Sequence, residues 1–272
     1  MKDVLPQQGT TDGLALQLDF VDNKAPLPAT TTLPRRQVQV VDQSQLSAAI
    51  ARHFRALREE VDQALDLQVD RRQRLADLLA SEPRPSAAVA QELTAIEVGQ
   101  GRVQSSSERL VRGAMRAFDL HLWNRLEPSP AAAAVVALYR DWHQQNGEAI
   151  SYQPAFYREV GAQRRDGRIG AMEQTLDPVL QMVLLADRLD VQVCPPLLRQ
   201  LAEAQVARDA NDLVTRLRAA AALQEQSVVA LQELRSRLDE WNDYQDLVQE
   251  ARSLIEKQRD VQHRTEETRG RK

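Results

Sequence analysis

The sequence is poor in the residues on which compact enzyme cores and disulfide-bonded domains rely. It has 4 Phe, 4 Tyr and 3 Trp among 272 residues, so its core must consist mainly of leucine, alanine and valine. Its single cysteine, Cys194, excludes an internal disulfide and a cysteine-based zinc site. The first residues lack the apolar core of a signal peptide, and no later window approaches the roughly 18 apolar residues of a membrane span. We therefore expect a soluble chain with no direct membrane span.

An excess of charge of one sign is also lacking. The 35 basic and 39 acidic residues are interleaved and give a net charge of −4. No large basic field is left to attract a nucleic-acid backbone, so we expect no nucleic-acid partner. A chain that is 43% hydrophobic, 27% charged and only 4% aromatic has the composition of long helical hairpins and coiled coils.

Proline and glycine crowd the first 40 residues, where the apolar pattern has a period of two. Large apolar side chains alternate with smaller or polar ones from Gly13 to Asp22, which predicts a strand over 13–22. A proline-rich loop follows, and 37–41 predicts a second, shorter strand. Residues 1–41 are therefore expected to form a two-stranded β segment, which is marginally stable on its own.

A long helical hairpin is predicted after this segment. From Asp42, a good helix N-cap, the apolar period lengthens to that of a helix. The helix should end before Pro83, and the turn there is short, which favours an antiparallel neighbour. Ser86 can cap this second helix, so that 42–127 forms the hairpin.

The rest of the chain predicts shorter helices followed by one long helix. Residues 128–196 begin with Ser129 and Pro130, a helix-starting pair, and their last helix should end at Cys194 and the two prolines after it. Residues 197–272 contain no proline and predict a long C-terminal coiled-coil helix. The expected fold class is mainly α: an elongated antiparallel long-helix hairpin or coiled-coil bundle with a short two-stranded N-terminal β segment.

The last helix carries a seam of apolar residues. They recur at intervals of three and four, close to the 3.5-residue repeat of a left-handed coiled coil. The members of the seam are Leu231, Leu234, Leu238, Trp241, Tyr244, Val248 and Ile255. The charges that flank it are mixed in sign, as on a solvated coiled-coil flank. We expect the seam to pair with the chain's own hairpin, with a second copy or with another coiled coil.

No arrangement of residues predicts catalysis or metal binding. The four histidines are scattered, and none has a second histidine or a cysteine three or four residues on. The run Gly99-Gln100-Gly101 interrupts a helical pattern and lacks the lysine of a phosphate loop, so a helix crossing or a flexible point is the better interpretation. The arginine clusters at 71–74 and 164–168 are better explained by a solvated helix face and a polar turn than by an acidic partner. We expect no enzyme activity, no cofactor and no metal.

The aromatic residues are unevenly distributed, since 7 of the 11 lie within 118–157. Rings gathered at the end of a helical hairpin favour a local core that caps short helices. Because aromatic rings also line binding pockets, a small-molecule or peptide site is the alternative. Its lining would be Trp123, Tyr139, Trp142, His143, Tyr152, Phe156, Tyr157 and Arg158.

Both ends of the chain resemble a known group of proteins. The run from Gly13 to Asn23, followed after the proline-rich loop by Val38-Gln39-Val40-Val41-Asp42 and a long helix, looks like the closing strands of an immunoglobulin-like domain. The stretch from Leu231 to Arg269 is similar to the helical arms of large membrane-anchored bacterial proteins of unknown function that contain such a domain. The chain has neither the membrane segments nor the earlier strands that this family places upstream. Met1 is then either a late start within a longer gene or the start of a trimmed relative.

The resemblance implies a periplasmic or cell-envelope location and a structural role, with a cytoplasmic location as the alternative. Together with the missing catalytic groups, it leads us to expect a non-enzymatic structural or protein-interaction protein. It would act through its long helices and the seam, either by self-association or by binding a protein partner. The alternative is a small-molecule or peptide-binding module that uses the aromatic segment 118–157.

Overall fold

The computed structural model describes residues 14–16, 19–21, 30–32, 36–38, 43–124, 129–146, 153–172 and 176–270. The chain divides into two compact units, Met1–Ile50 and Ala51–Lys272. The described residues are mainly α-helical, which confirms the coarse fold class predicted from the sequence. None of the described helices combines the length and the apolar composition needed to cross a membrane.

The first unit contains four short strands. They are β1 (Leu14–Leu16), β2 (Asp19–Val21), β3 (Thr30–Thr32) and β4 (Arg36–Val38). Antiparallel pairing joins β1 to β4 and β2 to β3. The predicted strands over 13–22 and 37–41 differ from these in number and extent. Thr30–Thr32, which lie between the two predicted strands, form a strand themselves, because β-branched residues suit extended pairing. Of the predicted strand residues, 13, 17, 18, 22 and 39–41 lie outside the described residues.

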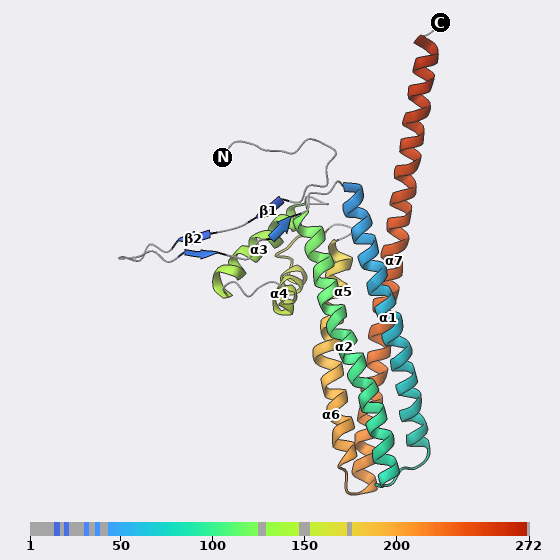
Figure 1. The fold of residues 1–272 in the computed structure, drawn as a ribbon. Coiled ribbons are helices and arrows are strands. Elements are labelled where there is room, and N and C mark those ends of the chain that lie inside the picture. Colours follow the sequence, from blue (N-terminus) through green and yellow to red (C-terminus); the bar gives the residue numbers. More distant parts are fainter. Residues whose placement is uncertain are drawn as a thin grey trace. The chain divides into compact units, whose positions relative to one another are not determined.

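Helices make up the rest of the described chain (Figure 1). They are α1 (Gln43–Ala80), α2 (Ala87–Trp123), α3 (Pro130–Asn146), α4 (Pro154–Arg165), α5 (Leu176–Arg188), the π-helix η1 (Leu189–Val193), α6 (Cys194–Gln205) and α7 (Ala210–Gly270). Two predicted caps are confirmed. The Ser86 hydroxyl accepts from the Val89 amide at 3.3 Å, and the Ser129 hydroxyl accepts from the Ala132 amide at 3.0 Å.

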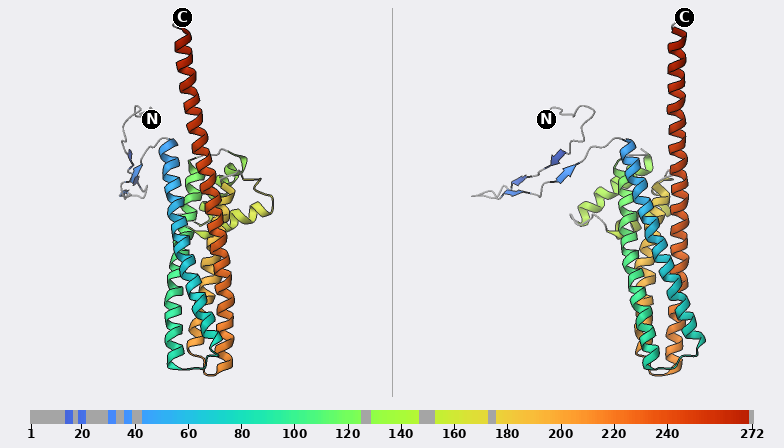
Figure 2. Two further views of the ribbon diagram at one scale, coloured as in Figure 1. Left: turned by 90° about the vertical axis from the view of Figure 1, so that its right-hand side faces the viewer. Right: turned by 45° about the vertical axis from the view of Figure 1, so that its right-hand side comes forward.

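The second unit is built on four helical columns that lie side by side (Figures 1 and 2). The columns are α1 from Ala51 onward, α2, the run of α5, η1 and α6, and α7. In the hydrogen bonds that join α1 to α2 and to α7, residues early in α1 pair with residues later in the other helix, and residues late in α1 pair with earlier ones. The helix α1 is therefore antiparallel to both. The third column packs against α2 and α7, and its residue numbers rise where those of α2 fall, since Asp190 bonds Ser107 and Gln205 bonds Glu97. Each column is thus antiparallel to its two neighbours, as in an up-down-up-down bundle.

Aliphatic side chains from all four columns fill the core of the bundle. One cluster of buried residues includes Leu75, Leu93, Ile96, Leu197, Leu201, Leu213 and Leu217. Side chains of this kind are the ones that the low aromatic content predicts for the core. The burial of such leucines contributes about 1.5–3 kcal/mol each, which makes this packing the main source of stability.

Two predicted boundaries in the C-terminal half are wrong. Cys194 and its two prolines do not end a helix, because the wide π-helical turn of η1 lets the column continue and places Pro195 and Pro196 in the first turn of α6. The helix predicted over 197–272 is also broken at 206–209, where the chain reverses. Asp209 caps α7 there, since its carboxylate accepts from the Asp212 amide at 2.8 Å.

Candidate functional site

The bundle is closed at one end by a stack of aromatic rings. Phe54 on α1 and Trp241 on α7 lie face to face, with 3.6 Å between ring centroids and 13° between ring planes. His121 on α2 meets both rings edge-on at 6.0 Å. All three side chains are buried. Trp241 is the last residue of α7 with a buried side chain among the described ones.

Ion pairs beside this stack fix the register of α1 against α7. Arg58 lies 2.7 Å from Asp239, and Arg235 lies 3.2 Å from Asp62, so the two pairs run in opposite directions between the helices. Arg58 also pairs with Asp62 on its own helix. The hydrogen bond that Arg58 donates to Asp239 raises the pKa of its guanidinium above its ordinary value. These pairs are half exposed, so they specify register more than they add stability.

Beyond Trp241, α7 continues as a single helix past the end of α2 (Figures 1 and 2). We call residues 242–266 the α7 extension. The large apolar side chains that the structure describes there are exposed: Tyr244 by 37%, Leu247 by 65%, Leu254 by 55%, Ile255 by 48% and Val261 by 62%. A helix that exposes such side chains is typical of a surface that pairs with another protein.

The exposed residues form an ordered pattern. Leu247, Leu254 and Val261 follow one another at intervals of seven, and Tyr244 and Ala251 lie beside them. We call these five residues the apolar stripe. Charged residues recur at the same interval along one edge of the stripe, and they are Asp243, Glu250, Lys257 and Arg264. All four are exposed.

The structure divides the predicted seam at Trp241. Leu231, Leu234, Leu238 and Trp241 are buried in the bundle. Tyr244 and Ile255 are exposed, and the Val248 side chain lies outside what the structure describes. Leu247, Leu254 and Val261 are not among the residues predicted for the seam. Their seven-residue spacing was the signal that could have identified them.

The structure brings most of the predicted pocket residues together, but their rings contact one another. Tyr139 meets Trp123 at 4.9 Å and Phe156 at 5.4 Å between ring centroids, and Phe156 meets Trp142 at 6.1 Å. These contacts are edge-to-face, and Phe156 and Tyr157 are buried. The exposed His143 lies 6.2 Å from Tyr139, and Tyr152 lies outside the described residues. Edge-to-face rings of this kind form a small core.

Two charged groups beside these rings have protein partners. The Arg158 guanidinium lies 3.1 Å from both carboxylate oxygens of Asp187, whose side chain is only 5% exposed. The Tyr157 hydroxyl donates to Asp119 at 2.9 Å. Burial raises the pKa of Asp119 to about 6, although this hydrogen bond opposes the shift. Arg158 is therefore engaged in holding a buried carboxylate.

Polar groups also surround the π-helix. The buried Ser107 hydroxyl lies 2.8 Å from Asp190 and 2.8 Å from the Gln104 carbonyl oxygen. Burial raises the pKa of Asp190, and it raises the pKa of the Cys194 thiol to about 12. A thiol that is protonated and buried is a poor nucleophile, so this group of residues does not suit thiol catalysis.

Buried polar side chains interrupt the apolar core on three of the columns. Gln68 on α1, Gln100 on α2, and Gln224 and Ser227 on α7 are all buried, and the Gln100 amide donates to Gln68 at 2.9 Å. No described group bonds the side chain of Gln224. The Gln68–Gln100 pair disfavours sliding of α1 along α2, because a slip would leave these two amides without each other.

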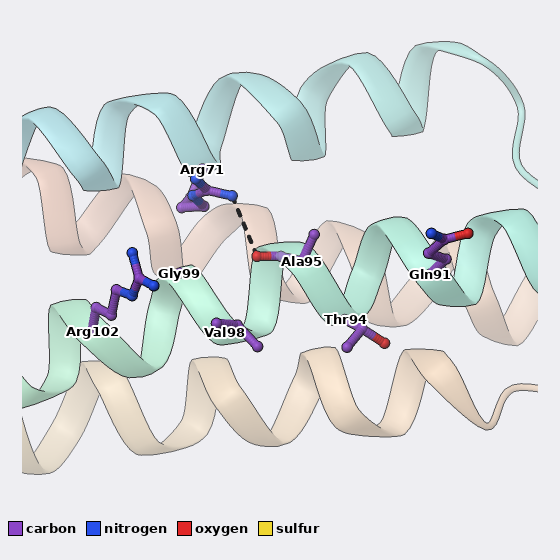
Figure 3. Close-up of a pocket in the computed structure, with 7 residues that line it drawn as sticks. All are labelled: Arg71, Gln91, Thr94, Ala95, Val98, Gly99 and Arg102. Atoms are coloured by element: carbon purple, nitrogen blue, oxygen red, sulfur yellow. Dashed lines mark hydrogen bonds between the residues drawn. The ribbon is translucent and has the colours of Figure 1, made fainter.

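A groove of about 440 Å³ lies between α1 and α2, lined by Arg71, Gln91, Thr94, Ala95, Val98, Gly99 and Arg102 (Figure 3). Arg71 bridges the two helices, donating to the Ala95 carbonyl oxygen at 3.3 Å and pairing with Asp70 at 2.9 Å. A Cβ at Gly99 would lie 2.5 Å from the Arg71 Nε atom, so this glycine permits the close approach. A second groove, of about 540 Å³, lies beside the α1–α2 turn and the start of α7. Neither has an aromatic lining.

Within the described part of the chain, no three His, Cys, Asp or Glu residues are grouped so that they could hold a metal ion. Comparison of the chain with protein-family models, with curated proteins and with solved structures gives no match. The α7 extension is therefore the candidate site that the geometry itself singles out.

Proposed function

We propose that this chain is a non-enzymatic protein-interaction protein in which the helical bundle carries the α7 extension as a docking surface. The observation that supports the proposal is the change in burial along α7. The same three-and-four spacing that buries Leu234 and Leu238 continues after Trp241, where Leu247 and Leu254 are more than half exposed.

Pairing with another helix would remove this stripe from water. Burying each large apolar side chain contributes about 1.5–3 kcal/mol, so a few of them suffice for association. The register of α7 is fixed, where the extension leaves the bundle, by the stack of Phe54 on Trp241 and by the Arg58–Asp239 pair. The start of the stripe next to the bundle is held in a fixed direction in this way, and this lowers the entropy cost of docking there.

The coiled-coil character of this contact and a cell-envelope location belong to the same proposal. The spacing of the stripe supports the first, and the resemblance to helical arms of membrane-anchored proteins supports the second. The aromatic segment is the less favoured site for a small molecule or peptide, because Tyr139 and Phe156 pack against neighbouring rings and Arg158 is held by Asp187.

Site-specific photo-cross-linking of the full chain tests the proposal. A photoreactive amino acid replaces Leu254 on the stripe, or Glu256 on the opposite, polar face, in the cells that naturally make the protein. The proposal predicts a cross-link to a protein helix from position 254 and none from position 256. Equal cross-linking from both faces, or none from position 254, would overturn it.

A further inference from the structure

The order of charges along the α7 extension indicates which helix fits it. We propose that the partner is a second copy of this chain, and that the two α7 extensions pair antiparallel about a two-fold axis near residues 252 and 253. This inference rests on the proposed function, because it names the partner of the same surface.

The apolar stripe fits one coiled-coil register. Leu247, Leu254 and Val261 occupy its d positions, and Tyr244 and Ala251 occupy a positions. In an antiparallel pair the a layers of one helix pack against the d layers of the other. Tyr244 would therefore meet the Val261 of the second copy, and Ala251 would meet its Leu254. The remaining layer sets Leu247 against Gln258, a polar core position of the kind that fixes register.

The edge charges decide between the orientations. Asp243, Glu250, Lys257 and Arg264 all occupy g positions, with the two acids first and the two bases last. Antiparallel helices bring g positions together, so Glu250 faces Lys257 of the second copy and Asp243 faces its Arg264. The two-fold axis repeats both pairs. In a parallel pair, Glu250 would instead face Ile255 and Lys257 would face Gln262, with no opposite charge.

The remaining charges act in the same direction. From Asn242 to Ala251 every charged residue is acidic, and these are Asp243, Asp246 and Glu250. From Arg252 to Arg264 four bases outnumber two acids. Antiparallel pairing places each acidic half against a basic half, whereas parallel pairing places like halves together.

The paired segment separates the two bundles. An axis between residues 252 and 253 sets residues 242–263 of one copy beside the same residues of the other, an overlap that is about 33 Å long at 1.5 Å per residue. Because the packed part of each α7 ends at Trp241, the two bundles of this kind would lie at opposite ends of the pair. The isologous contact closes on itself, so it produces a dimer and not a filament.

Charge exchange in the full chain tests the partner. Glu250→Lys alone and Lys257→Glu alone should each weaken dimerisation in sedimentation equilibrium by roughly tenfold or more, since each sets like charges opposite one another twice. Mixing these two variants should restore the wild-type affinity, because each then meets its complement. Both positions are exposed, so folding is not at stake.

Disulfide trapping tests the orientation. A mixture of the Tyr244→Cys and Val261→Cys variants should form a mixed disulfide, and neither variant alone should cross-link. The native Cys194 does not interfere, because it is buried. Disulfides within the Tyr244→Cys variant alone would overturn the antiparallel arrangement. A chain that stays monomeric while position 254 cross-links to a different protein would overturn the second copy as partner and leave the proposed function standing.

Discussion

Phe54 and Trp241 stack with 3.6 Å between their ring centroids, and this contact is where α7 leaves the bundle. Trp241 is 4% exposed, while Tyr244, one turn further on, is 37% exposed. Trp241 and Tyr244 therefore have different roles on one helix. Trp241 anchors α7 to α1, and Tyr244 belongs to the exposed stripe.

Replacing Trp241 should destabilise the bundle, whereas replacing Tyr244 should not. Trp241→Ala removes a buried ring and leaves a cavity beside Phe54, which typically costs about 3–5 kcal/mol. Tyr244→Ala, the matched control on the same helix, should change the free energy of unfolding by less than about 0.5 kcal/mol. Urea denaturation of the full chain measures both values. Similar losses for the two variants would show that the bundle does not end at Trp241.

Alanine at two glycines of α2 should have opposite effects. A Cβ at Gly113 would collide with the Leu57 side chain of α1, so Gly113→Ala should destabilise the protein by about 1–3 kcal/mol. No atom lies within 4 Å of a Cβ at Gly101. Gly101→Ala should therefore stabilise α2 by up to about 1 kcal/mol through helix propensity alone. Thermal unfolding monitored by circular dichroism compares them, and equal shifts would contradict the close approach of α1 at Gly113.

Removing Arg158 should destabilise the protein, because it leaves a buried carboxylate without its partner. Arg158→Ala leaves Asp187 without its guanidinium partner in a site where the carboxylate is 5% exposed, and should destabilise the protein by about 2 kcal/mol or more. Arg158→Ala combined with Asp187→Asn should recover much of this loss, because the amide carries no charge. A double-mutant cycle from denaturation curves measures the coupling. Full stability in the single variant would mean that Arg158 is available for a ligand.

The stability of the protein should depend on the protonation of Asp119. Its pKa is about 6 in the folded chain and near 3.9 when unfolded, so the folded state favours the protonated acid. Its contribution is fully present below about pH 4 and is lost as the pH rises through 6. Relative to Asp119→Asn, the wild-type chain should therefore lose about 1–2 kcal/mol between pH 4 and pH 7, after allowance for solvent screening. A difference between the two proteins that is constant with pH would contradict the buried position of this carboxyl group.

The sequence predicted the long helices and their caps, because these depend on local signals. The turn at Pro83, the cap at Ser86 and the start at Ser129 are each encoded within a few residues. The π-helix at Leu189–Val193 was missed, since its wide turn reconciles Pro195 and Pro196 with a continuous column only through packing on α2 and α7. The break before Asp209 was missed because it contains neither glycine nor proline.

The candidate site was predicted in part. The spacing from Leu231 to Ile255 identified a seam, but periodicity cannot tell a residue packed inside its own chain from one that faces water. That distinction depends on which residues of the fold surround each side chain, and Phe54 is the one that stacks on Trp241. Similarly, the clustering of aromatic residues within 118–157 correctly predicted that Tyr139 and Phe156 lie close together. Only the ring geometry reveals that these rings pack against each other and do not line a pocket.

Amide hydrogen exchange of the full chain, followed from low to high protein concentration, tests most directly whether the α7 extension is the surface through which the protein associates. In the dilute monomer, amides of the α7 extension should exchange quickly, because a solvated helix without a partner is marginally stable, while amides from 213 to 241 should be protected. With rising concentration, protection should increase within residues 242–266 and remain constant elsewhere. An increase in protection confined to residues 130–165, or slow exchange of the extension already in the monomer, would contradict the assignment of the α7 extension as that surface.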